Sequence, residues 1–160
     1  MKPTRVHNFG TYFVTAATWE RRSLFGSDPW AKLFLKTLYE YRATGKYLLH
    51  EFVLMPDHFH LIITPLDVPL ERALQFIKGG FSFRAGRGLA SAFEIWQKGF
   101  TDHRIRDAAD YDRCREYILM NPVRARFCVE PGQYPYSSAS SARVLDDVPQ
   151  RLKAAPRIAS

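Results

Sequence analysis

Apolar residues change their spacing along the chain, and each change marks an expected element. Residues 12–15 are β-branched or aromatic, as is typical of a strand. Apolar residues then recur at helical spacing, which predicts a helix that starts at Ser27 or Asp28, has Pro29 in its first turn, and stops at Gly45.

Two apolar-rich runs follow, at residues 47–55 and 58–64. Only Pro56-Asp57 separates them, which predicts an antiparallel hairpin with a very tight turn. After Pro65, apolar residues along one side predict a second helix that reaches the glycines of residues 79–88.

The last third of the chain is expected to add one strand and one helix. Residues 93–100 contain aromatic and β-branched side chains and are expected to form a short strand. Asp107 or Asp110 can cap the final helix, which Pro122 should end at or near Asn121, because the residue before a proline disfavours the α conformation.

The expected element order is β-α-β-β-α-β-α, without an internal repeat. An antiparallel sheet with helices on one face is an α+β, ferredoxin-like or RRM-like plan, which many single-strand nucleic-acid binders use. The length of 160 residues suits one core. We expect one domain over residues 1–142 and a flexible tail over residues 143–160.

The composition indicates a basic protein with a packed hydrophobic core. It is 46% hydrophobic, which excludes a mostly disordered chain, and its formal net charge is +7. A positive field attracts polyanions, so nucleic acid is the leading partner class, although many basic proteins bind none. The candidate DNA-contacting residues are Arg5, Lys78, Arg84, Arg87, Lys98, Arg104, Arg106 and Arg124.

Several other classes of protein are not expected from this sequence. Cys114 and Cys128 do not form a C-x-x-C pair, which argues against a disulfide framework or a zinc ribbon and suits a cytoplasmic location. No apolar run approaches the roughly 20 residues of a membrane span. The glycines near residues 79–88 lack a P-loop lysine pattern, so nucleotide binding is not expected.

His58 and His60 are the first candidates for chemistry. The period of two along a strand puts both imidazoles on one face and Phe59 on the other. Such a pair can hold a metal ion, but a bare His-x-His is more often packed or exposed without one. A third ligand is therefore needed.

The final helix can supply that ligand and a nucleophile. Tyr117 and Asn121 lie about 40° apart around the helix axis, so they project together. Taken alone, Tyr117 would be interpreted as an ordinary half-buried tyrosine and Asn121 as a helix C-cap. Tyr111 lies about 240° from Tyr117, and Tyr134 and Tyr136 follow the helix, so we assign these three to packing.

Phosphodiester cleavage needs an in-line nucleophile and a cation that neutralises charge on the phosphate. Phenols are poor nucleophiles at neutral pH, so a metal that polarises the phosphate would help the tyrosine. Hydrolysis by water would not require the tyrosine.

At these residues the sequence resembles the single-tyrosine HUH transposases of small insertion sequences, most closely the REP-associated tyrosine transposases (RAYT). The resemblance covers about residues 10–141. Its carriers are Tyr12-Phe13-Val14-Thr15, Met55-Pro56-Asp57-His58-Phe59-His60-Leu61, Trp96-Gln97 with Phe100 and Arg104, Tyr117-Ile118-Leu119-Met120-Asn121-Pro122-Val123-Arg124-Ala125 and Tyr134-Pro135-Tyr136-Ser137-Ser138.

The resemblance implies a role for each of four residues. His58 and His60 match the metal-binding pair, Asn121 the third ligand and Tyr117 the nucleophile, with Mg²⁺ or Mn²⁺ as the metal. It implies a bacterial cytoplasmic enzyme, monomer or homodimer, that acts on the DNA of the nucleoid. The substrate is single-stranded DNA with hairpin or palindromic repeats, cut to a 5′-phosphotyrosine and a free 3′-OH and then rejoined.

Two alternatives stay open. One is a non-catalytic ferredoxin-like module that binds single-stranded nucleic acid by stacking and phosphate contacts. The other is a metal phosphodiesterase that uses water. The joint presence of His58, His60, Tyr117 and Asn121 favours the transposase, because binding alone needs none of them at these spacings.

Overall fold

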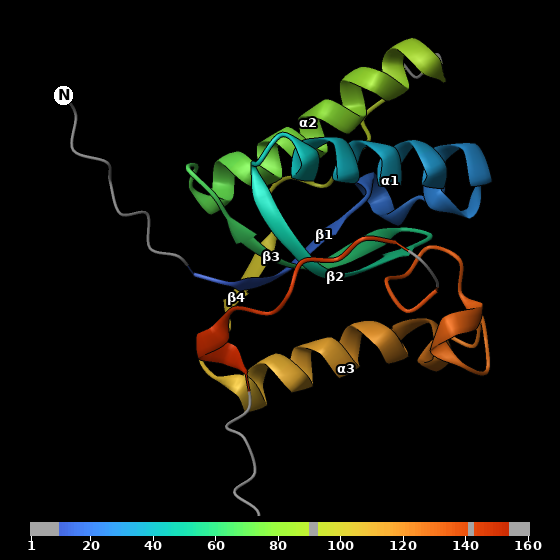
Figure 1. Ribbon diagram of the computed structural model, residues 1–160. Helices are drawn as coiled ribbons and strands as arrows, with labels where there is room; N and C mark the ends of the chain where they lie inside the picture. Colours follow the sequence, from blue (N-terminus) through green and yellow to red (C-terminus); the bar gives the residue numbers. More distant parts are fainter. Residues whose placement is uncertain (1–9, 90–92, 141–142, 154–160) are drawn as a thin grey trace, which may run out of the picture.

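The computed structural model describes residues 10–89, 93–140 and 143–153. Its centre is a four-stranded antiparallel sheet with the strand order β2-β3-β1-β4 (Figure 1). This order, with the chain order β-α-β-β-α-β-α, is the ferredoxin-like plan and confirms the predicted α+β fold. The strands are β1 (Tyr12–Ala17), β2 (Tyr47–Met55), β3 (His58–Pro65) and β4 (Thr101–Arg104).

Helices cover both faces of this sheet. Helices α1 (Asp28–Ala43) and α2 (Leu70–Gly88) lie on one face, and α3 (Ala108–Arg124) lies on the other (Figure 1). The expectation of helices on one face therefore holds for α1 and α2 only. Strands β2 and β3 are buried along nearly their whole length, so each of their two apolar faces needs a covering layer.

The first two helices follow the expected boundaries and pack closely. Ser27 is the N-cap of α1, and Gly45, at a φ of +79°, lies just beyond the end of the helix. In α2, a Cβ on Gly80 would lie 2.4 Å from the Tyr41 hydroxyl oxygen of α1. Any larger residue at this position would require the Tyr41 ring to move.

The prediction of a strand at residues 93–100 is wrong. The fourth strand is β4, which begins at Thr101 and pairs antiparallel with β1. The apolar residues before it pack into the core from a loop: Trp96 is buried, and its indole Nε1 donates a hydrogen bond to the Lys78 carbonyl oxygen at 2.9 Å. All four β4 residues are exposed, so the strand carries no apolar signal.

Helix α3 extends beyond the expected end. Asp107 is its N-cap and accepts a hydrogen bond from the Asp110 N–H at 2.8 Å, as predicted. The helix passes through Pro122 to Arg124. Pro122 has no N–H to donate, but it is buried, and its carbonyl accepts the Phe127 N–H at 2.9 Å beyond the helix end.

The chain after α3 returns along the outer edge of β2. Leu54 N–H donates to the Tyr136 carbonyl at 2.8 Å, and Ser138 N–H donates to the Phe52 carbonyl at 2.9 Å. Further on, the backbone N–H of Asp146 donates to the Leu49 carbonyl at 2.8 Å.

Residues 143–153 continue this packing, whereas the flexible tail expected over residues 143–160 stays a prediction. The Asp146 carboxylate binds the Arg42 guanidinium at 2.8 and 2.9 Å, and Leu152 is 2% exposed. Residues 154–160 lie outside the described part, and the domain boundary at residue 142 stays a prediction. Within the described residues, the helices lack the combination of length and apolar character that a bilayer span requires.

Candidate active site

The candidate histidines stand on the sheet face that α3 covers. Strand β3 alternates as predicted: Phe59 and Leu61 join the core under α1 and α2, whereas the ring of His60 contacts the ring of Tyr117 from α3. Ile62 packs in the smaller apolar cluster beneath α3. The alternation therefore sends His58 and His60 to the α3 side.

The structure brings three of the four predicted residues into one group. The ring centroids of His58 and His60 lie 4.8 Å apart, and those of His60 and Tyr117 lie 5.2 Å apart. Phe13 of β1 stacks on His60 at 5.3 Å and meets Tyr117 edge-on at 5.8 Å. Phe13 thus fixes the imidazole and the phenol relative to each other.

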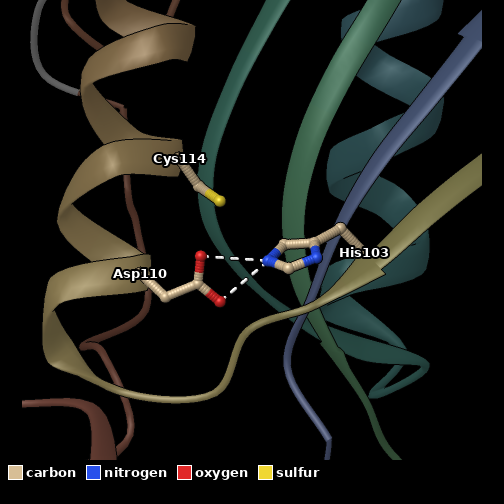
Figure 2. Close-up of side chains that lie close together, drawn as sticks. All are labelled: His103, Asp110 and Cys114. Carbon is tan, nitrogen blue, oxygen red and sulfur yellow. Dashed lines mark hydrogen bonds and ion pairs between the residues drawn. The ribbon is translucent and has the colours of Figure 1, made fainter.

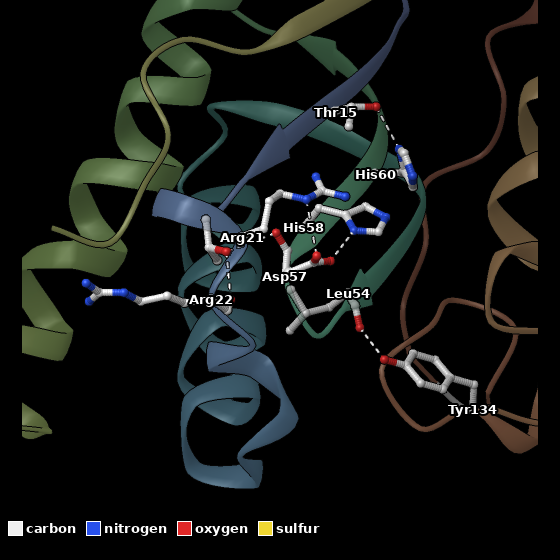
Figure 3. A network of polar contacts seen from close by, with 9 residues as sticks. Thr15, Arg21, Arg22, Leu54, Asp57, His58, His60 and Tyr134 are labelled. Carbon is white, nitrogen blue, oxygen red and sulfur yellow. Dashed lines mark hydrogen bonds and ion pairs between the residues drawn. The ribbon is translucent and has the colours of Figure 1, made fainter. Parts of the chain in front are cut away.

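Each histidine is anchored through the same ring nitrogen. The Nδ1 atom of His58 lies 2.7 Å from the Asp57 carboxylate, and that of His60 lies 2.7 Å from the Thr15 hydroxyl (Figure 3). When Nδ1–H donates to these oxygens, the lone pair of each ring is on Nε2. Metal-binding histidines are usually held in this way.

The Nε2 atom of His60 is the observation that fits a metal. Within the described residues it is a buried nitrogen without a hydrogen-bond partner. Leaving such an atom unsatisfied costs about 1–3 kcal/mol, so its presence calls for a ligand. The Nε2 atoms of His58 and His60, with the Asn121 side-chain oxygen, are the atoms that would hold a divalent ion.

The protonation state of His60 suits this role. Burial lowers its pKa to about 3, and the neighbouring His58 and Arg21 act in the same direction. The ring is therefore neutral near pH 7, which is the form that binds metal.

The turn between β2 and β3 positions Asp57. The Arg21 guanidinium lies 3.2 Å from the Asp57 carboxylate (Figure 3). The Asp57 carbonyl accepts the Thr18 N–H at 2.9 Å. Residues 56 and 57 alone form the turn, as predicted. The sequence placed Asp57 beside the histidines, but it gave no role to Thr15 or Arg21. Their roles depend on the register between β1 and β3, in which Thr15 lies opposite His60.

The side chain of Tyr117 is exposed, in contrast to those of Tyr111 and Tyr134. Its side chain is 44% exposed, whereas Tyr111 and Tyr134 are each 7% exposed. Burial raises the pKa of Tyr111 to about 12 and also raises that of Tyr134. The hydroxyl of Tyr136 donates to Asp28, and this bond raises the pKa of Tyr136 to about 12. These three phenols serve packing and hydrogen bonding.

Two further residues of α3 lie close to Tyr117. The Arg124 guanidinium carbon is 5.7 Å from the centre of the Tyr117 ring. Asn121 is half-buried and follows Tyr117 by one helical turn, which puts it on the same side of α3. Phe13, Thr15, His60 and Tyr117 are among the residues that line a pocket of about 500 Å³.

The other basic candidates are divided between the two sides of the sheet. Lys78, Arg84 and Arg87 belong to α2, on the face away from Tyr117. The Lys78 ammonium donates to the carbonyls of Gln97 and Gly99, and Arg84 pairs with Glu40. Lys98 precedes β4, Arg104 is in β4, Arg106 follows it, and Arg5 lies outside the described residues. Their contacts with DNA stay predictions.

Comparison with known proteins places the chain in a family. The model of the IS200-like transposase family matches residues 7–121. An uncharacterised protein of Haemophilus influenzae is 30% identical over 71% of this chain and 81% of its own length. A REP-associated tyrosine transposase of Escherichia coli is 26% identical over 81% of this chain and 76% of its own length.

Solved structures agree with the fold. A REP-associated tyrosine transposase bound to a REP hairpin has a TM-score of 0.71, with 22% identity over 98% of this chain and 99% of its own. A Deinococcus radiodurans protein described as a putative transposase has a TM-score of 0.53, with 17% identity over 74% of this chain and 95% of its own. On the family match over residues 7–121, the chain belongs to the IS200-like transposase family.

Proposed function

We propose that this transposase is a metal-dependent endonuclease and strand transferase for single-stranded DNA, with Tyr117 as its nucleophile. One observation carries the proposal: the buried, unpartnered Nε2 of His60 lies in a ring that contacts the exposed ring of Tyr117. A metal-ligand atom and a phenol are thus available to the same phosphate.

We infer the reaction from the resemblance to the single-tyrosine HUH transposases. The Tyr117 oxygen attacks the phosphorus, the bond from phosphorus to the 3′-oxygen breaks, and this oxygen leaves with a proton as a 3′-OH. The 5′-phosphate stays on Tyr117, so the bond is conserved and a 3′-OH can reverse the step to rejoin strands. A divalent ion bound by His58, His60 and Asn121 supplies neutralisation of charge on the phosphate oxygens.

The donor set bears on the identity of the metal. Two imidazole nitrogens and one amide oxygen favour Mn²⁺ over Mg²⁺ on ligand preference, whereas Mg²⁺ is far more abundant in cells. We propose that either ion supports cleavage.

The substrate class rests on the relatives. The structural neighbour with a TM-score of 0.71 is bound to a REP hairpin, and an E. coli relative is a REP-associated transposase. We infer that this chain also acts on hairpin-forming single-stranded DNA. His58, His60 and Tyr117 meet within a single chain, which supports action as a monomer.

A covalent-adduct assay tests the proposal. The protein is incubated with Mn²⁺ and a panel of single-stranded hairpin oligonucleotides and is resolved on a denaturing gel. We expect a DNA-linked species with the wild type and with the control Tyr111→Phe, and none with Tyr117→Phe. Tyr111 is the matched control because it lies on the same helix and is buried.

The same gel separates the alternatives. An adduct with Tyr117→Phe would refute the assignment of the nucleophile. Cleavage without any adduct would point to water as the nucleophile, and DNA binding without cleavage would point to a non-catalytic module.

A further inference from the structure

A second group of polar side chains lines the same pocket, where β4 meets the first turns of α3. His103 projects from β4, and Asp110 and Cys114 stand one turn apart on α3 and point toward it (Figure 2). One ligand atom from each lies within 4.8 Å of the others. Among the His, Cys, Asp and Glu residues that the structure describes, no other group of three could hold a metal ion.

Within this group, His103 and Asp110 are hydrogen-bonded to each other, and the Cys114 thiol lies beside them. His103 Nε2 lies 2.8 and 3.0 Å from the two carboxylate oxygens of Asp110. Asp110 is 8% exposed and also accepts the Arg106 backbone N–H at 3.0 Å. Arg113 approaches this carboxylate at 3.6 Å, but its side chain is 70% exposed and can turn to solvent.

We propose that His103, Asp110 and Cys114 bind one divalent cation of the Zn²⁺ class through an imidazole nitrogen, a carboxylate oxygen and a thiolate. Nitrogen, oxygen and sulfur donors together suit Zn²⁺ and its analogue Co²⁺. Zinc ligands at their usual bond lengths stand roughly 3–4 Å apart. Atoms as far apart as 4.8 Å therefore have to approach by about 1 Å, whereas His103 Nε2 and the Asp110 oxygens, now 2.8 and 3.0 Å apart, have to separate slightly to hold an ion between them.

The protonation of the three side chains determines which protons metal binding must displace. Burial raises the pKa of Cys114 to about 11, so the sulfur carries a proton when no ion is bound. Burial alone would raise the pKa of Asp110, but hydrogen bonds from the Arg106 N–H and from His103 lower it, so the carboxylate is ionised. When the metal binds, the thiol proton of Cys114 is released to solvent, and the hydrogen that His103 Nε2 donates to Asp110 has to leave this nitrogen, by transfer to Nδ1 in a neutral ring.

This site differs from the set of His58, His60 and Asn121 in its ligand atoms and in the elements that a bound ion would connect. Only the new site contains sulfur, so a sulfur-specific signal distinguishes them. An ion at this site would tie β4 to α3 at a point three residues before Tyr117. Its fourth coordination position would open into the pocket of about 500 Å³ that also reaches Tyr117. A phosphate or a water can take that position.

Cobalt titration of the full chain tests the proposal without DNA. The protein carries His58→Ala and His60→Ala to silence the other site, and Co²⁺ is added under reducing conditions. We expect a near-ultraviolet thiolate-to-cobalt band that saturates at one ion and disappears when Zn²⁺ is added. Cys114→Ser should remove the band, and His103→Asn should weaken affinity at least about tenfold, as loss of a ligand does.

Cys128→Ser is the matched control, because Cys128 is the other free cysteine and lies outside the group. It should leave the band unchanged. The proposal is overturned if no thiolate band appears, if the band survives in Cys114→Ser, or if Cys128→Ser removes it. Cys114→Ser keeps the bonds from Asp110 to His103 and Arg106, and circular dichroism verifies its fold. A negative result here leaves the adduct assay on Tyr117 unaffected.

Discussion

The two faces of the sheet are built from the same strands but differ in how completely they are covered. Under α1 and α2, side chains such as Phe34, Phe59 and Phe81 are fully buried and pack ring against ring. Under α3 the apolar cluster is smaller, and it borders the pocket that contains His60 and Tyr117. One face therefore supplies most of the core, and the other leaves room for chemistry.

Strand β3 shows how one segment serves both purposes. Neighbouring residues point to opposite faces, so Phe59 belongs to the core while His58 and His60 belong to the candidate site. If this division is correct, substitutions one residue apart should separate activity from stability. The following predictions test it, from the largest expected effect to the smallest.

His60→Ala should lower DNA cleavage on the order of 10³-fold, because it removes a ligand of the ion that stabilises charge on the phosphate. Its cost in unfolding free energy should be smaller than that of Phe59→Ala, because it removes the contact with Phe13 and the hydrogen bond to Thr15 but also the buried, unpartnered Nε2. Single-turnover cleavage and urea denaturation measure the two quantities. A variant that unfolds instead would show that His60 belongs to the core.

Phe59→Ala should give the opposite result. It deletes a fully buried ring that packs on Phe34 at 5.0 Å, and such changes cost about 3–5 kcal/mol of unfolding free energy. Urea denaturation measures the loss. At temperatures where the variant is still folded, its cleavage rate should remain within a few-fold of wild type; a loss as large as that of His60→Ala would contradict the division.

Thr15→Val should weaken binding of Mn²⁺ by about 10–100-fold, because it removes the hydroxyl that orients His60 through Nδ1. Thr11→Val is the matched control: its hydroxyl bonds Thr64 at 2.8 Å and does not contact the histidines. Isothermal titration calorimetry compares both variants. Equal affinities for wild type and Thr15→Val would show that the Thr15 hydroxyl does not support the site.

The dependence of stability on pH should also reflect the burial of His60 on the sheet face that α3 covers. The pKa of His60 is about 3 in the folded protein, against 6.5 for an ordinary histidine. Between these values the unfolded chain binds a proton that the folded chain does not, so stability falls as the pH drops from 6.5 toward 3. The slope from this residue is about 1.4 kcal/mol per pH unit.

Denaturation of the EDTA-treated protein at several pH values measures this slope. Other groups titrate in the same range, so the difference between wild type and His60→Gln isolates the contribution of His60. Parallel curves for the two proteins would contradict the low pKa.

The sequence predicted local features well and long-range features poorly. The side-chain alternation at residues 58–60 and the Tyr117–Asn121 spacing follow from the geometry of one strand and one helix. The strand at Thr101 was missed because its side chains are exposed, whereas the preceding Trp96 is buried from a loop. The contact between Arg42 and Asp146 spans 104 residues and leaves no periodic signal.

The same limit applies within the candidate site. Thr15 is opposite His60 only because β1 pairs with β3 in one register, and sequence periodicity does not specify which residues face each other across strands. The group of His103, Asp110 and Cys114 likewise depends on how β4 meets α3.

The return of the chain along β2 has a consequence for self-association. A bare edge strand offers unpaired N–H and C=O groups that recruit other chains into aggregates. Here the edge of β2 is occupied at Leu49, Phe52 and Leu54 by residues of the same chain. The opposite edge, β4, has only four residues and carries charged side chains, two devices that discourage strand addition. The sheet is thus protected at both edges against extension by a neighbouring molecule.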